Sequence, residues 1–122
     1  MTSVRKKKKI KMDKKREEQI INQMNVHVML IEKEARSVGL VMIENEYAKS
    51  CEEFVKTQDL YTVLNTRGET HTAIYVFKYP CMEDVINFTL GRICDPKVVR
   101  RWIEGKMFGY PDEKISKFIE GE

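Results

Sequence analysis

Residues 60–77 read LYTVLNTRGETHTAIYVF, a segment that contains two runs rich in β-branched and aromatic residues. Side chains of these types favour β-strands. The polar residues 65–69 separate the two runs, and Gly68 among them can adopt a positive φ. We therefore expect a β-hairpin with a loop of about four or five residues in the middle of the chain.

The second run of this hairpin is apolar on both faces. Ala73, Tyr75 and Phe77 would lie on one face of the strand, and Ile74 and Val76 on the other. A lone two-stranded ribbon is only marginally stable in water. The hairpin therefore needs cover from flanking helices, or a third strand from elsewhere in the chain or from a partner chain.

The residues before the hairpin have the spacing of a helix. From about residue 13 to residue 36, apolar side chains recur at intervals of three and four, which predicts one long N-terminal helix. This stripe either packs on the chain's own domain or forms a coiled-coil seam in a homodimer, and the first outcome is the more frequent. The stripe consists of Ile21, Met24, Val28, Ile31 and Ala35.

A second helix is expected after Gly39. The same spacing continues from residue 40 to residue 56, although residues 40–43 form a continuous apolar run that could instead be a short strand. We favour the helix because the spacing persists through Phe54. The stripe of this helix consists of Leu40, Ile43, Tyr47, Cys51 and Phe54.

Two or three short helices are expected after the hairpin. Residues 82–90 form an amphipathic pattern that Gly91 stops, and a last helix opens at Pro111. Between them, Asp95 and Pro96 are typical of an N-cap and a first helical position, and Gly105 would end that middle helix. The apolar side chains expected to be buried in it are Val98, Val99, Trp102 and Ile103.

These elements together predict an α+β fold that is mainly helical. It would comprise one long N-terminal helix, a second helix, a central β-hairpin and two or three short C-terminal helices. Phe108 and Tyr110 are expected to pack the last two helices together. We expect a single domain over residues 13–122, preceded by a basic, disordered arm over residues 1–12.

The arm is where the positive charge of the chain is concentrated. Residues 1–16 hold nine basic side chains and one acidic side chain, a net charge of +8, whereas the other residues hold 13 basic and 18 acidic side chains, a net charge of −5. Charges this dense resist burial, and they suit a polyanion because neutralising phosphates releases counterions. The alternative is a solvated tail that aids solubility. The basic side chains are Arg5, Lys6, Lys7, Lys8, Lys9, Lys11, Lys14, Lys15 and Arg16.

The composition argues against several classes of protein. No apolar run approaches the roughly 18 residues that a membrane span requires, so we expect no membrane partner. The three cysteines form no Cys-x-x-Cys pair and lie apart from both histidines, so neither a metal site nor a cofactor is expected. The odd cysteine count fits a reducing, cytoplasmic location, and Cys51 and Cys81 are expected to be small core residues on helices. No catalytic motif or phosphate-binding glycine loop occurs, which argues against an enzyme and leaves no catalytic residues to name.

Residues 95–106, DPKVVRRWIEGK, resemble the recognition helix of phage-repressor-type helix-turn-helix domains. The match lies in Trp102, Gly105 and Lys106. Gly91 lies eleven residues before Trp102, farther than in the compact motif. The alternative, a capped surface helix, is the more frequent outcome for such a pattern. The resemblance implies that three basic side chains face DNA: Lys97, Arg100 and Arg101.

Residues 102–119 are similar to the C-terminal segment of small uncharacterised proteins of phages and prophages of Gram-positive bacteria. Those proteins often begin their last helix with Phe/Tyr-Gly-Tyr-Ser-Asp-Glu, and this chain has Pro111 where the serine would stand. The resemblance implies a mobile-element origin and the cytoplasm of a bacterial host cell.

The charge pattern and this resemblance favour a small non-enzymatic binding protein. We expect it to engage nucleic acid or a nucleoprotein complex, in the manner of anti-CRISPR inhibitors of host nucleic-acid-handling machinery. The alternative is a helix-turn-helix-like DNA-binding transcriptional regulator.

Overall fold

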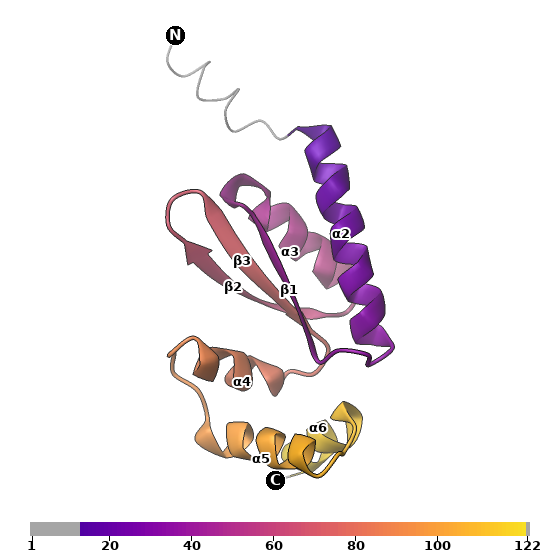
Figure 1. Ribbon diagram of the computed structural model, residues 1–122, viewed down its shortest axis with the longest axis vertical. Helices are drawn as coiled ribbons and strands as arrows, with labels where there is room; N and C mark the ends of the chain where they lie inside the picture. The colour runs from indigo at the N-terminus through magenta and orange to yellow at the C-terminus, as the bar shows by residue number, and fades with distance from the viewer. Residues whose placement is uncertain (1–12, 122) are drawn as a thin grey trace.

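The structure, a computed structural model, describes residues 13–121. A three-stranded antiparallel sheet with the order β1-β3-β2 separates two groups of helices (Figure 1). α2 and α3 cover one face, and α4, α5 and α6 pack against one end of the other face. The expected α+β, mainly helical fold is confirmed. The elements are α2 (Lys14–Glu32), β1 (Val38–Glu44), the 3-10 turn η1 (Asn45–Tyr47), α3 (Ala48–Thr57), β2 (Tyr61–Arg67), β3 (His71–Phe77), α4 (Met82–Thr89), α5 (Pro96–Met107) and α6 (Asp112–Glu120).

The predicted hairpin is formed by β2 and β3, which pair from Tyr61 with Phe77 to Arg67 with His71. Gly68 has a φ of 69° in the connecting turn, as the sequence suggested. β3 is the central strand, because β1 pairs with its second edge. The central position explains why both faces of β3 are apolar, since each face packs against its own group of helices.

The expectation of a helix from residue 40 is wrong, because residues 38–44 form β1 and the second helix begins only at Ala48. Val41 and Ile43 point into the core while Leu40 and Met42 are exposed, the alternation of a strand with one covered face. The second edge of β3 carries backbone N–H and C=O groups that need partners, and the pairing of residues 38–44 with this edge outweighs the helical spacing of the local sequence. The strand alternative for residues 40–43 is therefore the correct one.

The long N-terminal helix is confirmed as α2. Asp13 caps it, accepting a hydrogen bond from the backbone N–H of Lys15 (2.9 Å). Most of the stripe of α2 packs in the chain's own core, which is the first of the two outcomes considered for it. The buried side chains of α2 are Ile20, Met24, Val28 and Ile31, and Ile21 and Ala35 are not among them.

The C-terminal part holds three helices around a second core cluster. Asp95 caps α5 through the backbone N–H of Lys97 (2.9 Å), as predicted. α5 continues through Gly105 to Met107, past the expected end. Trp102 is buried as expected, but Ile103 is 46% exposed. The second cluster consists of Val63, Phe77, Met82, Ile86, Trp102 and Ile115.

Candidate functional site

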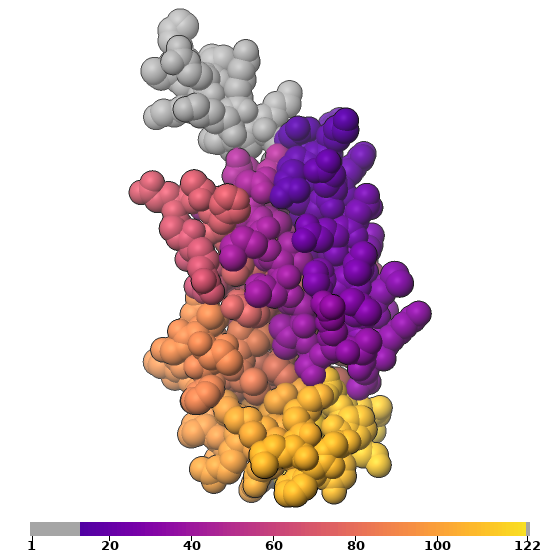
Figure 2. Space-filling view, in the orientation of Figure 1, coloured from indigo at the N-terminus to yellow at the C-terminus, as the bar shows by residue number. Residues whose placement is uncertain are grey.

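The basic residues singled out in the sequence fall into two groups that the fold keeps apart. The arm residues Arg5, Lys6, Lys7, Lys8, Lys9 and Lys11 lie outside the described residues. Lys14, Lys15 and Arg16 form the first turn of α2, whereas Lys97, Arg100 and Arg101 lie on α5. The start of α2 (indigo) and the C-terminal helices (orange to yellow) occupy opposite ends of the molecule (Figures 1 and 2). One flat surface therefore cannot use both groups at once.

Arg16 holds the start of α2 in place. Its guanidinium donates two hydrogen bonds to the Glu44 carboxylate at the end of β1 (2.9 and 2.7 Å), and this contact lowers the pKa of that carboxyl. Beside it, the backbone N–H of Asp13 donates to the Tyr47 hydroxyl (3.1 Å). Arg16 therefore has a structural partner, whereas Lys14 and Lys15 are exposed on the same turn.

The basic residues of α5 differ in their surroundings. Lys97 and Arg100 are exposed. Arg101 contacts Glu104 (3.4 Å), and its guanidinium carbon lies 5.7 Å from the centroid of the Phe118 ring. Residues 90–95 join α4 to α5, a longer connection than the turn of about three or four residues in helix-turn-helix units. The resemblance to such units is therefore confined to the capped start of α5 and the residues around Trp102.

The end of the molecule beyond α5 is shaped by a close approach of two helices. Gly105 packs against Ile115, and a Cβ on Gly105 would lie only 2.5 Å from Cγ1 of Ile115. The two helices are also joined by an ion pair of 2.6 Å between Lys106 and the buried Asp112 in the first turn of α6, where the helix dipole favours an acid. These contacts hold α5 and α6 at a fixed crossing.

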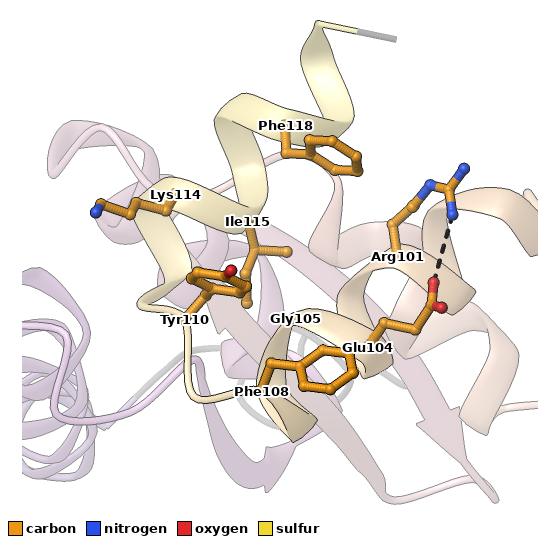
Figure 3. Close-up of a pocket in the computed structure, with 8 residues that line it drawn as sticks. All are labelled: Arg101, Glu104, Gly105, Phe108, Tyr110, Lys114, Ile115 and Phe118. Atoms are coloured by element: carbon orange, nitrogen blue, oxygen red, sulfur yellow. Dashed lines mark hydrogen bonds and ion pairs between the residues drawn. The ribbon is translucent and has the colours of Figure 1, made fainter.

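A hollow of about 460 Å³ opens between α5 and α6 beside this crossing. Figure 3 shows three aromatic rings, those of Phe108, Tyr110 and Phe118, arranged around Ile115 and Gly105. The rim carries charges of both signs. The lining residues are Arg101, Glu104, Gly105, Phe108, Tyr110, Lys114, Ile115 and Phe118.

Three exposed aromatic side chains line the hollow, and we call the apolar surface formed by Phe108, Tyr110 and Phe118 the α5–α6 patch. Phe108 is 74% exposed, Phe118 is 59% exposed and Tyr110 is 54% exposed. The expectation that Phe108 and Tyr110 pack the helices together is wrong, because the contact of Gly105 with Ile115 does so. The sequence carried one signal for this surface: residues 96–120 contain more apolar side chains than one buried stripe on each helix can use.

Cys51 and Cys81 are poorly suited to act as nucleophiles. Burial raises the pKa of the Cys51 thiol to about 11 and also raises the pKa of Cys81, and the thiolate is the reactive form. Cys51 is buried in α3 as expected, and the half-buried Cys81 lies at the N-cap of α4. Within residues 13–121, no three His, Cys, Asp or Glu side chains are grouped so as to hold a metal ion.

His27 gives the fold a pH dependence that can be measured. Its buried Nδ1 has no hydrogen-bond partner and lies against Gly39. Burial, reinforced by the charge of Arg36, lowers the pKa of His27 below its ordinary value of 6.5. His27 therefore binds a proton more readily in the unfolded chain than in the folded chain. The free energy of unfolding should decrease as the pH falls below 6.5, the ordinary pKa of histidine.

We expect the free energy of unfolding to decrease when the pH is lowered from about 7.5 to about 5.5. The free energy of unfolding of the His27→Gln variant should decrease less over the same interval. Urea denaturation at the two pH values measures the difference. The lowered pKa of Glu44 acts only below that group's ordinary value of 4.5, outside this interval. Equal losses in both proteins would show that His27 is not responsible.

Each helix within residues 13–121 is too short or too polar to cross a membrane. Comparisons of the chain with models of protein families, with curated proteins and with solved structures found no match.

Proposed function

We propose that this chain is a small non-enzymatic binding protein that engages nucleic acid or a nucleoprotein complex through its basic N-terminal segment. The observation that carries the proposal is the division of charge, +8 over residues 1–16 against −5 over the remainder. Lys14 and Lys15 extend this charge onto the exposed first turn of α2.

The division of charge also orients the contact. Phosphates are attracted by the basic segment and repelled by the acidic remainder, so a polyanion meets the molecule at the end where α2 begins. Each neutralised phosphate releases counterions, which makes the affinity strongly dependent on salt. A binding role of this kind requires no catalytic group, and the raised thiol pKa values are consistent with that.

We further propose that the protein acts in the cytoplasm of a bacterial host, as an anti-CRISPR-like inhibitor of a nucleic-acid-handling machine. This finer proposal rests on the resemblance of residues 102–119 to proteins of phages and prophages. Such an inhibitor would place its basic segment on nucleic acid already held by the machine and its folded domain against the protein surface.

The salt dependence of binding tests the role of the basic segment. We expect the full-length protein to bind labelled DNA or RNA, single- or double-stranded, with a slope of log affinity against log salt of about −4 to −6. The variant Lys7→Gln/Lys8→Gln/Lys9→Gln should reduce the magnitude of this slope by about three, because each lysine neutralises one phosphate.

The matched control neutralises three exposed lysines of the folded domain, Lys33→Gln/Lys49→Gln/Lys56→Gln. This variant carries the same net charge as the arm variant and should keep the slope of the unchanged protein. Equal slopes for the two variants would show that only net charge matters. No binding by the full-length protein at physiological salt would remove the proposed direct contact with nucleic acid.

A DNA-binding regulator is the second candidate, favoured by the exposure of Lys97 and Arg100 three residues apart on the capped helix α5. Binding by the basic segment is uniform across sequences, whereas side chains that contact base edges discriminate between them. The same assay, repeated with unrelated DNA sequences, therefore distinguishes the two candidates. A marked preference for one sequence would favour the regulator.

A further inference from the structure

The α5–α6 patch is an apolar surface that the chain itself leaves uncovered. Phe108, Tyr110 and Phe118 are each more than half exposed. Because a fully accessible aromatic side chain offers roughly 150–250 Å², the patch exposes roughly 300–450 Å² of mainly apolar surface. Patches of this size on single proteins are often binding sites, and aromatic side chains are enriched in protein interfaces.

The patch combines a hollow with a projecting side chain. The hollow of about 460 Å³ between α5 and α6 is large enough to accept an aromatic ring. Phe108 stands at its rim and is 74% exposed (Figure 3). A surface that carries both a cavity and a ring to fill it can match a copy of itself, as an interface with two-fold symmetry requires.

The charges around the hollow fit the same kind of partner. Arg101 and Lys114 lie on the rim together with Glu104. Glu104 contacts Arg101 within its own copy (3.4 Å), and in a two-fold arrangement it can also face Lys114 of the other copy, so two identical rims need not repel one another. A strongly charged partner would gain little from a rim that carries both signs.

We propose that a second copy of this chain docks on the α5–α6 patch, with Phe108 of each copy seated in the hollow of the other. A stable interface buries about 800 Å² on each partner, so the patch would form its apolar centre and the contact would extend over neighbouring surfaces of α5 and α6. This dimer differs from the coiled-coil dimer considered from the sequence, which would use the stripe of α2, where Met24, Val28 and Ile31 lie in the core. The proposal does not depend on nucleic-acid binding.

One consequence is bivalency. α5 and α6 lie at the end of the molecule opposite to the first turn of α2 (Figure 2), so a dimer joined through the patch carries the first turns of its two α2 helices, with Lys14 and Lys15, at its far ends. Two linked contacts with one polyanion strengthen binding beyond the affinity of either contact.

Sedimentation equilibrium of the full-length protein, without nucleic acid, tests the proposal over a wide range of concentrations. We expect a concentration-dependent rise toward twice the 14.4 kDa mass of one chain. The Phe108→Ser variant should dissociate at least tenfold more readily. Phe88→Ser is the matched control, because Phe88 is 58% exposed on α4 outside the patch and should leave the dissociation constant unchanged.

A second variant, Glu104→Arg, leaves the apolar patch intact but gives each rim three positive charges. It should also weaken association, and added salt should restore part of the loss. Thermal melts followed by circular dichroism establish that each variant is folded. A chain that stays monomeric at millimolar concentration, or equal effects of Phe108→Ser and Phe88→Ser, would overturn the proposal.

Discussion

Replacing Trp102 with alanine is expected to lower the free energy of unfolding by about 3–5 kcal/mol. Trp102 is 5% exposed and lies in the cluster that joins α4, α5 and α6 to the sheet through Phe77 and Val63. The substitution removes this contact and leaves a cavity between the helices and the sheet. Since small domains are stable by only about 5–15 kcal/mol, the loss would be a large fraction of the total.

The neighbouring residue provides the control. Ile103 lies on the same helix and is 46% exposed, so Ile103→Ala should cost less than about 1 kcal/mol. Urea denaturation should be followed by far-ultraviolet circular dichroism, because Trp102 is the only tryptophan of the chain and its removal abolishes that fluorescence. Comparable losses in the two variants would mean that Ile103 is buried as its helical spacing suggested, and would contradict the fold described for α5.

The sequence predicted best where local chemistry alone decides the conformation. Gly68 in a polar loop between two β-rich runs was sufficient to predict the hairpin, and the pair Asp95 and Pro96 was sufficient to predict the start of α5. In each case the signal lies within a few residues, because turns and helix caps are satisfied by neighbouring groups. These features needed no knowledge of the rest of the chain.

The prediction failed for β1 because the decisive contact is distant in sequence. Val41 and Ile43 alternate as in a strand, but Leu40 and Ile43 also have the spacing of a helix. The pairing of β1 with β3 joins residues more than 25 positions apart, from Val38 with Phe77 to Glu44 with His71. Short apolar runs are ambiguous in this way, and only the partner strand resolves them.

The α5–α6 patch could not be located from the sequence for a similar reason. Helical spacing indicates that one face of a helix is apolar, but it does not say how much of that face a neighbour covers. Phe108 and Phe118 are exposed because Gly105 lets Ile115 approach α5 closely and closes the core beneath them. The basic segment, by contrast, was evident from composition, because charge requires no tertiary contact to be recognised.

The close approach at Gly105 leads to the second large effect. Gly105→Ala should lower the free energy of unfolding by about 1–3 kcal/mol, because the added methyl would collide with Cγ1 and Cδ1 of Ile115. An alanine in a helix would otherwise gain about 1 kcal/mol over glycine. A net loss therefore shows that the collision outweighs the helical preference. Cγ1 is bonded directly to the branch point Cβ, so a rotation that swings Cδ1 away leaves the contact with Cγ1 in place.

A double-mutant cycle identifies the collision as the cause. Ile115→Ala alone should cost about 2–5 kcal/mol, because Ile115 is 3% exposed. In that background, Gly105→Ala meets no branched side chain, so it should be neutral or stabilising. The double variant should then be about 1–3 kcal/mol more stable than the sum of the two single losses implies. Additive losses in urea denaturation would mean that the glycine serves another purpose, and that the crossing of α5 and α6 depends on the ion pair of Lys106 with Asp112 instead.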